Sequence, residues 1–462
     1  MIISQLPELF VQRERALLGP RFDAMFSYPG QGAVRGASVN ALRCTPQQFA
    51  ALADFPLEAS PFCASAFVVP QPDWKPGRHP YHHAGAFYAQ EPSASAPAAL
   101  LDVHPGMRVA DLCAAPGGKT SQLAAALAGH GVLLANEFVA ARAEVLRQNL
   151  ERMGVTNAIV TNEDTARLAA AYPGQFDRIL VDAPCSGEGM FRKIPEARDE
   201  WSENNVKICA VRQAEILREA WKTLRPGGLL IYSTCTFNRL ENEGSLEGLL
   251  AEAGEEIVES TAFDCPPAWG VVCGRVGPFR TFRFYPHRTR GEGFFAAVAR
   301  KVSDGGSRVR VPKSRRTIFA PAGRRECAEL SRWVAEPERM RFAAVADVYY
   351  AYYESQYEAV KMLAESLRVI ASGVAMGQIF KERLKPDHAL AMFCGLDRGA
   401  VPVAELSEEE ALRFLRKQEA EAAAFAEGMN LVTHGGAALG FAKRIQNRVN
   451  NMYPNSLRIF NL

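Results

Sequence analysis

Short apolar runs alternate with segments of helical periodicity between Met107 and Ser233, and this alternation limits the possible fold more than any other feature. Strands that alternate with helices form a parallel sheet covered by helices on both faces. Ligands of such sheets bind at the carboxyl ends of the strands, where the strand order reverses. We therefore predict an α/β domain with strands at 108–113, 132–136, 158–161, 178–182 and 229–233, and helices at 119–128, 140–153 and 206–224.

A glycine-rich segment, Asp111-Leu-Cys-Ala-Ala-Pro-Gly-Gly-Lys-Thr120, lies between the first of these strands and the first helix. Glycines let the backbone approach a ligand closely, and the helix N-terminus offers unpaired N–H groups. A phosphate-binding P-loop is disfavoured, because Cys113 occupies the position of that loop's first glycine. Glu137, at the end of the second strand, is a candidate acceptor for the two hydroxyls of a ribose. The segment predicts a nucleotide-like ligand, although dinucleotide sites share this arrangement.

Two cysteines follow two other strands of the predicted sheet. Cys185 belongs to Asp182-Ala-Pro-Cys-Ser-Gly187, and Cys235 belongs to Ser233-Thr-Cys-Thr236. Because each segment directly follows a strand, we expect both thiols at the sheet edge that carries the glycine-rich segment. A lone cysteine is usually a small buried apolar residue. We interpret six of the others in that way: Cys63, Cys209, Cys265, Cys273, Cys327 and Cys394.

Two thiols beside a nucleotide site favour methylation of a pyrimidine carbon over methylation of an amine, which needs no thiol. Carbon 5 of cytosine is a poor nucleophile until a thiolate adds to carbon 6 and converts the ring into an enamine. A base then removes the proton from carbon 5, and the thiol leaves. Asp182 is a candidate to protonate or hydrogen-bond the ring nitrogen and so make carbon 6 more electrophilic. Spacing alone does not decide which cysteine attacks.

With these segments the chain resembles the Nop/Sun family of RNA cytosine methyltransferases, and within it the F type of bacterial small-subunit ribosomal RNA methyltransferases. The resemblance covers nearly the whole chain and also rests on His83-Ala-Gly-Ala-Phe-Tyr-Ala-Gln-Glu-Pro-Ser93, Phe237-Asn-Arg-Leu-Glu-Asn-Glu243, Arg283-Phe-Tyr-Pro-His287 and Gly291-Glu-Gly-Phe-Phe295. It implies a Rossmann-like class I methyltransferase domain, an N-terminal α+β RNA-recognition domain and a C-terminal PUA-like domain. It implies S-adenosylmethionine (S-adenosyl-L-methionine) as the cofactor and 16S ribosomal RNA of the small ribosomal subunit as the partner.

The resemblance also assigns roles to individual residues. It implies Cys235 as the nucleophile and Cys185 as the residue that assists product release, while Asp182 keeps the activating role argued above. The implied cofactor contacts are Cys113, Ala114, Ala115, Pro116, Gly117, Gly118, Lys119, Glu137, Asp164 and Asp182. In the C-terminal region, where cations suit phosphates and a tyrosine suits base stacking, the expected RNA contacts are Lys443, Arg444, Arg448 and Tyr453.

The remaining features concern metals and the cellular compartment. His79, His82 and His83 have no acid or cysteine clustered with them, so we expect an RNA-facing or structural role and no metal. The ten cysteines show no Cys-x-x-Cys spacing, and free thiols fit a reducing cytosol. Charged residues interrupt the N-terminal apolar stretch, which predicts an amphipathic helix within residues 1–19, and no apolar run has membrane-spanning length. We predict a cytoplasmic monomer that binds no membrane.

We divide the chain into five regions. The net charge of only +2 means that any basic surface for RNA is local. The segment 303–325 is basic and rich in Gly, Pro and Ser, which predicts a linker, and the last region contains an expected helix at 407–427. The regions are an N-terminal RNA-recognition domain (1–100), the methyltransferase domain (101–302), the basic linker (303–325), a helix-rich connecting domain (326–390) and the PUA-like domain (391–462).

Two other functions stay open at this point. The first is a cytosine-5 methyltransferase that acts on transfer RNA. The second is a ribosome-assembly factor that binds RNA without catalysis. The presence of Cys185, Cys235, Asp182 and Lys119 argues against the second.

Overall fold

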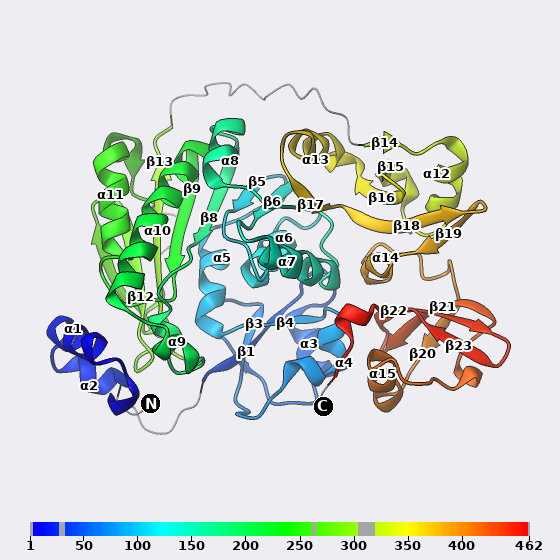
Figure 1. Ribbon diagram of the computed structural model, residues 1–462, viewed down its shortest axis with the longest axis horizontal. Coiled ribbons are helices and arrows are strands. Elements are labelled where there is room, and N and C mark those ends of the chain that lie inside the picture. Colours follow the sequence, from blue (N-terminus) through cyan, green and yellow to red (C-terminus); the bar gives the residue numbers. More distant parts are fainter. Residues whose placement is uncertain (1–2, 27–32, 261–264, 304–318, 461–462) are drawn as a thin grey trace.

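Figure 1 shows the computed structural model of the chain, which describes residues 3–26, 33–260, 265–303 and 319–460. The strands of these residues form four sheets, of four, ten, five and four strands along the chain. The ten-stranded sheet and its helices form a central domain, and the two C-terminal sheets lie beside it, on the right of the view. No helix within the described ranges is both long and apolar enough to cross a membrane.

The central domain confirms the predicted parallel sheet. Its five middle strands are parallel and lie in the order β7-β6-β5-β8-β9. The chain runs outward from β5 to β7 and returns on the other side of β5, so the strand order reverses between β5 and β8. Ligands bind at such a reversal. The strands are β5 (Arg108–Asp111), β6 (Val132–Asn136), β7 (Ala158–Thr161), β8 (Phe176–Asp182) and β9 (Leu224–Thr234).

Antiparallel strands extend this sheet at both edges. Next to β9 lie β13 (Phe294–Lys301), β12 (Phe279–Phe284) and β11 (Val272–Val276), and β10 (Ile257–Val258) also pairs with β13. At the other edge, β17 (Val369–Ser372) pairs with β7 although it comes from the region predicted to connect the domains. The central sheet is therefore completed by a strand from outside the predicted methyltransferase domain.

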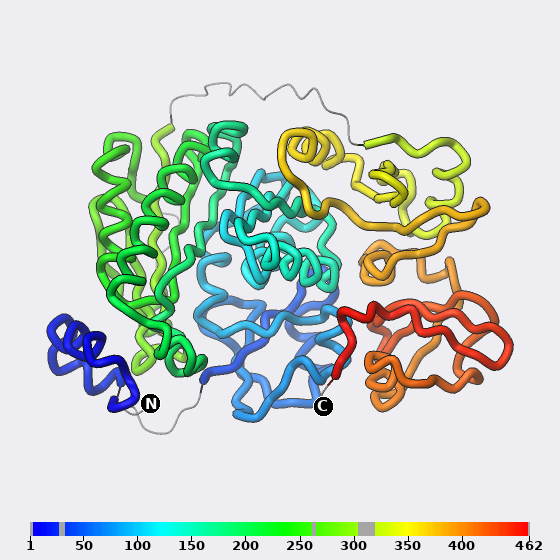
Figure 2. Tube along the Cα trace, viewed as in Figure 1, coloured from blue at the N-terminus to red at the C-terminus, as the bar shows by residue number. Residues whose placement is uncertain are grey.

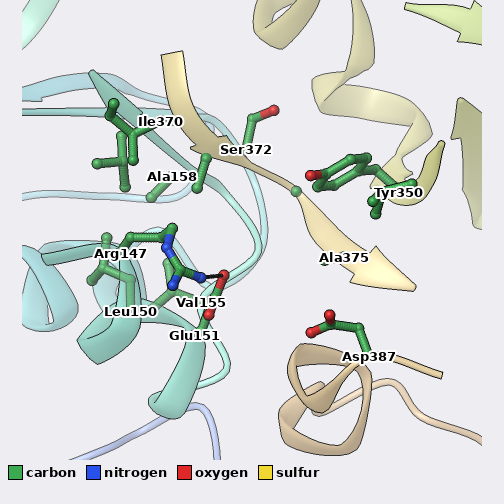
Figure 3. Close-up of a pocket in the computed structure, with 14 residues that line it drawn as sticks. Arg147, Leu150, Glu151, Val155, Ala158, Tyr350, Ile370, Ser372, Ala375 and Asp387 are labelled. Carbon is green, nitrogen blue, oxygen red and sulfur yellow. Dashed lines mark hydrogen bonds and ion pairs between the residues drawn. The ribbon is translucent and has the colours of Figure 1, made fainter. Parts of the chain in front are cut away.

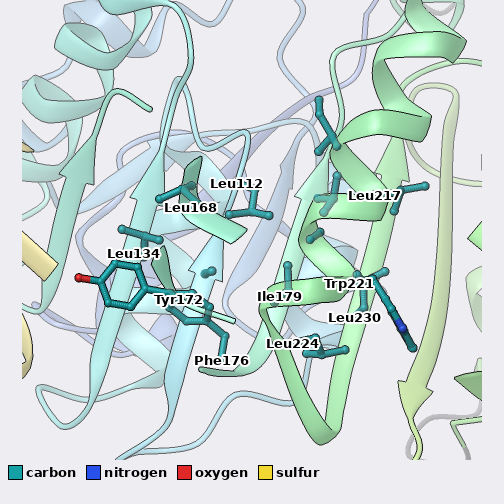
Figure 4. Packing of buried hydrophobic residues seen from close by; sticks show 14 of the residues in the cluster. Leu112, Leu134, Leu168, Tyr172, Phe176, Ile179, Leu217, Trp221, Leu224 and Leu230 are labelled. Carbon is teal, nitrogen blue, oxygen red and sulfur yellow. The ribbon is translucent and has the colours of Figure 1, made fainter. Parts of the chain in front are cut away.

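Helices cover both faces of the central sheet because its strands carry apolar residues on both faces. In β8, Ile179 and Val181 face one core while Leu180 faces the other. Figure 4 shows the first core, where Ile179 and Leu230 pack beside Leu217. The helices on that side are α8 (Thr165–Ala171), α10 (Glu203–Thr223), α11 (Glu243–Ala253) and α13 (Glu354–Ser366), and those on the other are α5 (Ala96–Leu100), α6 (Gly118–Ala126) and α7 (Ala140–Arg152).

Residues 1–100, predicted as one domain, divide into two parts that lie apart in Figure 1. The helices α1 (Glu8–Leu18) and α2 (Arg21–Phe26) pack on the central domain through an aromatic cluster that includes Phe191, Trp201 and Phe237. The other part is a four-stranded sheet in the order β2-β3-β1-β4. Its elements are β1 (Arg35–Val39), α3 (Pro46–Leu52), β2 (Glu58–Ala59), β3 (Ala66–Val69), α4 (Pro80–His83) and β4 (Phe87–Ala89).

The prediction that residues 326–390 are helix-rich is wrong. This region holds most of a five-stranded sheet in the order β14-β15-β16-β18-β19, since runs such as Val348-Tyr-Tyr-Ala-Tyr-Tyr353 favour strands strongly. Of the predicted linker, 304–318 lie outside the described residues, and the sheet already begins at Ala320. The elements are β14 (Ala320–Pro321), α12 (Arg324–Ser331), β15 (Met340–Val345), β16 (Val348–Tyr353), β18 (Val374–Phe380), β19 (Arg383–Pro386) and α14 (His388–Met392).

The last region is a small sheet in the order β20-β21-β22-β23, and the helix α15 packs on it. The helix predicted at 407–427 is wrong in length, because α15 ends at Leu415. Lys417 adopts a left-handed φ of 55°, and the N–H of Gln418 bonds the carbonyl of Arg413, which closes the helix. The elements are β20 (Val403–Glu405), α15 (Glu408–Leu415), β21 (Gly428–His434), β22 (Ala437–Ile445) and β23 (Arg448–Asn451).

Candidate active site

The glycine-rich segment joins β5 to α6 at the edge of the sheet where the strand order reverses. Gly117 adopts a left-handed conformation with a φ of 114°, and a Cβ at this position would lie 3.1 Å from Leu146. A Cβ at Gly118 would lie 3.1 Å from the ring of Tyr88. Both positions therefore favour glycine, which lets the loop lie tightly between α7 and the N-terminal sheet.

A cavity of about 530 Å³, which we call the main cavity, lies beside this loop. That volume is within the range of small-ligand sites, about 300–1,000 Å³. The whole run Cys113–Lys119 lines the cavity, as do Asp182, Cys185 and Cys235. Further lining comes from the His83–Ser93 and Gly291–Phe295 segments, so the cavity joins these two motifs to the glycine-rich segment and to both cysteine segments.

The two cysteines predicted to meet lie side by side in this cavity. Strands β8 and β9 are in register with Asp182 opposite Ser233, so the residues that follow them come together. The Sγ atoms of Cys185 and Cys235 are 3.3 Å apart, and both residues are half-buried. The hydrogen bond with Cys235, and then burial, raise the pKa of Cys185 well above its ordinary value. A Cys185 thiol that keeps its proton can donate its S–H to Cys235 and stabilise a thiolate there.

Asp182 has a polar partner on each carboxylate oxygen. Lys119 Nζ donates to Oδ2 at 2.7 Å, and Ser233 Oγ donates to Oδ1 at 2.7 Å. Burial alone lowers the pKa of Lys119, but the Asp182 carboxylate outweighs burial, and the pKa is raised. Lys119 therefore keeps its proton at neutral pH, and its ion pair holds the Asp182 carboxylate beside the two thiols.

Asp111, at the end of β5, is a buried acid with only part of its hydrogen-bonding capacity used. Its Oδ2 accepts a hydrogen bond from Thr120 Oγ1 at 2.8 Å, while its Oδ1 has no partner among the described residues. Burial raises the pKa of Asp111 to about 7. An unpartnered carboxylate oxygen in the cavity wall suits a ligand that brings hydrogen-bond donors or positive charge.

Glu137 and Asp164, two predicted cofactor contacts, do not line this cavity. The Glu137 carboxylate accepts the N–H of Val139 at 2.9 Å and lies 3.4 Å from Arg142. Asp164 is exposed and caps α8 by accepting the N–H of Ala166 at 2.7 Å. Both acids follow the neighbouring strands β6 and β7, so a ligand reaches them only by extending from the cavity across these strand ends.

Tyr88 and Arg142 are among the residues of the cavity wall that were not predicted as site residues. The hydroxyl of Tyr88 donates to the carbonyl of Pro116 at 3.2 Å, and Arg142 donates to the carbonyl of Ala115 at 2.9 Å. Both therefore hold the glycine-rich loop from outside, and burial raises the pKa of Tyr88 to about 12. Tyr88 lies in the His83–Ser93 motif on which the resemblance rests, so the sequence could have indicated it as a site residue. Arg142 lies in no motif, and only its place five residues after Glu137 pointed to it.

A buried carboxylate joins the two cysteine loops behind the thiols. Glu241 accepts hydrogen bonds from the N–H of Ser186 at 2.9 Å, from Asn238 at 2.6 Å and from Gln213 at 2.8 Å. The hydroxyl of Ser186 also donates to it. Burial raises the pKa of Glu241 above its ordinary value. This network fixes the Cys185 loop to the Cys235 loop.

The predicted RNA contacts of the C-terminal region differ in accessibility. Lys443 and Arg448 are exposed on β22 and β23. Arg444 is half-buried and donates to the backbone carbonyls of Phe425 and Gln446. Lys443 and Arg448 are therefore the two of these cations whose side chains are open to a phosphate.

The prediction that Tyr453 stacks on a base is wrong in this structure. Tyr453 is only 2% exposed and packs against Phe414 and His388. Its hydroxyl lies 3.1 Å from Nδ1 of His83, across the contact between the C-terminal region and the N-terminal sheet. The ring is buried because this contact removes its apolar surface from water.

Two of the three histidines near the N-terminal motif have polar protein partners. His79 lies 2.9 Å from Asp54, and His83 lies 2.9 Å from the carbonyl of Gly77. His82 is half-buried, its Nδ1 has no hydrogen-bond partner among the described residues, and burial lowers its pKa well below the ordinary value, so it is neutral. These contacts fit a structural role, the second of the two roles that we expected for these histidines. Within the described ranges no three potential metal ligands cluster together.

A second cavity, of about 280 Å³, lies between α7, β7 and the β17–β18 segment (Figure 3). Arg147 and Glu151 pair at 2.5 Å in its wall, and Tyr350 and Asp387 line it from the five-stranded-sheet region. None of the predicted site residues lines this cavity. It lies at the contact between the central domain and the region that follows it.

The chain matches three models of protein families. Residues 98–300 match the model described as 16S rRNA methyltransferase RsmB/F. Residues 6–92 match the N-terminal domain of 16S rRNA methyltransferase RsmF, and residues 401–459 match the RsmF PUA domain. These matches cover both ends of the chain as well as the central domain.

Curated relatives are similar over nearly their whole length. Ribosomal RNA small subunit methyltransferase F of Salmonella arizonae is 34% identical over 458 residues, covering 92% of this chain and 90% of the relative. The protein of the same name from Aliivibrio fischeri is 32% identical over 442 residues, covering 92% and 91%.

Solved structures are similar over about two thirds of the chain. A methyltransferase homolog protein from Pyrococcus horikoshii is 28% identical, with a TM-score of 0.54, and covers 65% of this chain and 100% of that one. NSun6 from Pyrococcus horikoshii, solved with SFG, has a TM-score of 0.55 at 20% identity over 66% of this chain and 100% of that one, a similarity of fold alone.

Proposed function

The chain belongs to the RsmB/F family of 16S rRNA methyltransferases, and from this membership we propose that it methylates carbon 5 of a cytosine in 16S ribosomal RNA through a covalent cysteine–cytosine intermediate. The observation that supports the covalent route is the pair of thiols 3.3 Å apart in the wall of the main cavity. Methylation of an amine needs neither thiol, and a dinucleotide site uses neither.

S-adenosylmethionine is the proposed donor, and it supplies an electrophilic methyl group on a positively charged sulfur. The run Cys113–Lys119 would hold it in the cavity, with Glu137 at the ribose and Asp164 at the adenine. Two features of the cavity fit such a ligand. The close backbone around Gly117 makes room for it, and the unpartnered Oδ1 of Asp111 suits a ligand that carries positive charge and an ammonium donor.

Cys235 is the proposed nucleophile. Its thiolate sulfur forms a bond to carbon 6 of the cytosine, the electron pair of the 5,6 double bond shifts between carbons 5 and 4, and the pair of the N3–carbon 4 double bond moves onto N3. Asp182 passes to N3 a proton drawn from the Lys119 ammonium 2.7 Å behind it, which neutralises the charge that develops on N3. Carbon 5 then forms its bond to the methyl carbon as the bond between that carbon and the donor sulfur breaks.

Cys185 is the proposed aid to product release. When a base removes the proton from carbon 5, the electron pair re-forms the 5,6 double bond, the bond between Sγ of Cys235 and carbon 6 breaks, and N3 returns its proton to the pair of Asp182 and Lys119. The departing sulfur is then a thiolate, and the protonated Cys185 at 3.3 Å can donate a hydrogen bond to it. The raised pKa of Cys185 keeps that proton in place.

Transfer of labelled methyl groups from S-adenosylmethionine to small ribosomal subunits or to their RNA tests the proposal. We expect Cys235→Ala to lower transfer about a thousandfold or more, because the nucleophile is lost. The matched control is Cys273→Ala, which removes an exposed thiol on the edge strand β11. Label that persists in Cys235→Ala, or that enters transfer RNA in place of 16S RNA, would contradict the proposal.

Cys185→Ala tests the second thiol. Because the departing thiolate loses its hydrogen-bond donor, we expect a covalent protein–RNA adduct to accumulate under turnover, visible as a slowly migrating band on a denaturing gel. The band requires Cys235, so Cys185→Ala combined with Cys235→Ala should not form it. Normal turnover of Cys185→Ala without any adduct would remove Cys185 from the release step.

A further inference from the structure

We propose that the N-terminal helix pair, α1 and α2, holds the two cysteine loops in the geometry needed for attack, with Arg13 and Glu188 as positioning residues. The helix pair was predicted only as part of an RNA-recognition domain. It instead packs on the central domain, away from the four-stranded sheet that follows it in the chain (Figure 1). The inference rests on the proposed function, because it concerns the placement of Cys235.

Glu188 connects the loop of one cysteine to the loop of the other. It follows Cys185 by three residues, and its Oε2 accepts the N–H groups of Phe237 and Asn238, each at 3.0 Å. These are the second and third residues after Cys235. The N–H of Gly189 also donates to the carbonyl of Cys235 at 2.8 Å. The backbone that carries the nucleophile is thus held by the segment that follows Cys185.

Arg13 of α1 forms an ion pair with this carboxylate. The Glu188 side chain is fully buried, and Arg13 Nη2 lies 2.5 Å from its Oε1. Trp201 donates to the same oxygen at 3.0 Å. A buried carboxylate is strongly disfavoured when its cation is removed, because its charge is then uncompensated. Arg13 therefore compensates the charge of the carboxylate that accepts both backbone N–H groups.

Aromatic packing joins the helix pair to the same two loops. The ring of Phe10 lies 5.1 Å from the ring of Phe191, which directly follows the Glu188–Met190 turn. The ring of Phe26 lies 6.1 Å from that of Phe237. Phe10, Phe26, Phe191 and Phe237 are all buried. Each helix of the pair thus contacts one of the loops directly.

The expected effect falls on the chemical step. A misplacement of a reacting group by about 1 Å can lower the rate of the chemical step about a hundredfold. We expect Arg13→Ala to lower the single-turnover rate constant at saturating RNA, and kcat with it, about 10- to 100-fold. Affinities for RNA and for S-adenosylmethionine should stay within about twofold, because no residue of α1 lines the main cavity. Arg13→Lys keeps the charge and one donor, and should recover most of the rate.

The matched control is Arg15→Ala on the same helix. Arg15 carries the same charge as Arg13 but is exposed, and its ion pair is with Asp23 of α2. If α1 attracted RNA through its charge, Arg13→Ala and Arg15→Ala would weaken RNA binding alike. If α1 positions the cysteine loops, only Arg13→Ala lowers kcat. Hydrogen exchange of the peptide 233–243 gives a second readout, since Arg13→Ala should accelerate exchange of the Phe237 and Asn238 amides about tenfold or more.

Wild-type kcat in Arg13→Ala, or a loss confined to RNA affinity and shared by Arg15→Ala, would overturn the inference. Should Arg13→Ala fail to fold, Arg13→Gln retains a donor toward Glu188 and is judged by the same criteria. Cys235→Ala measured in parallel separates the two claims. Inactive Cys235→Ala together with fully active Arg13→Ala overturns the positioning role alone, whereas active Cys235→Ala overturns the proposed nucleophile.

Discussion

Glu14 makes the packing of the N-terminal helices depend on pH. Its side chain is fully buried on α1, where Oε1 accepts a hydrogen bond from Arg13 Nε at 3.0 Å and Oε2 has no partner among the described residues. Burial, and then the nearby Glu188 carboxylate, raise the pKa of Glu14 to about 7, although Arg13 and Arg283 act in the opposite direction. A neutral Glu14 therefore fits this position better than a charged one.

The sign and size of the effect follow from proton binding. The folded protein holds this proton more tightly than the unfolded chain, whose glutamate has the ordinary value of 4.5, so stability is highest below that value and falls as pH rises toward 7. At about 1.36 kcal/mol per pKa unit, the cost of ionising Glu14 reaches about 3 kcal/mol at pH 8. Between pH 5 and pH 8 the change is about 2.5 kcal/mol, or about 70-fold in an opening equilibrium.

Glu14→Gln removes this titration. The free energy needed to open α1 should therefore rise by up to about 3 kcal/mol relative to the wild type at pH 8, and by much less at pH 5. Hydrogen exchange of peptides from residues 8–26, corrected for the intrinsic pH dependence of exchange, measures the opening of α1 itself. Glu8→Gln, on the exposed face of the same helix, is the control for loss of one negative charge. An opening free energy of wild-type α1 that does not change with pH, or an equal gain in Glu8→Gln, would refute the reasoning.

Three further predictions concern the main cavity and the C-terminal region. Lys119→Ala, which deprives Asp182 of its partner at 2.7 Å, should lower single-turnover methyl transfer about a hundredfold, and an unchanged rate would exclude the proton-relay role. Tyr453→Ala should destabilise the C-terminal region by about 3–5 kcal/mol in denaturant unfolding, whereas a surface role predicts almost no change. Lys443→Gln combined with Arg448→Gln should weaken RNA binding and lower its salt slope by about two, and an unchanged slope would exclude both as phosphate contacts.

The central domain was predictable because its periodicity is local. The strands Val132–Asn136 and Ala158–Thr161 have the bounds predicted from the sequence. The meeting of Cys185 and Cys235 was also predictable, because each follows a strand and parallel strands end at one edge. Their adjacency needed no knowledge of side-chain packing.

Features that depend on tertiary contacts were not predictable in the same way. The ring of Tyr453 has the same sequence pattern whether it faces RNA or packs against Phe414, and only the contact between two distant regions decides. Strand β17 joins the central sheet from a region more than two hundred residues beyond its partner β7. Arg13 contacts Glu188 across 175 residues, and no local pattern marks such a pair.

The bond between Cys235 and a cytosine is the central claim, and a trapping experiment tests it most directly. In RNA with 5-fluorocytosine, the step that removes the proton from carbon 5 is blocked, so the covalent adduct should persist. Digestion and mass spectrometry of wild-type protein incubated with this RNA and S-adenosylmethionine then identify the attached residue. The account predicts a nucleotide on Cys235 whose formation requires Asp182. An adduct on Cys185, or none while the methyl group is still transferred to unmodified RNA, would contradict it.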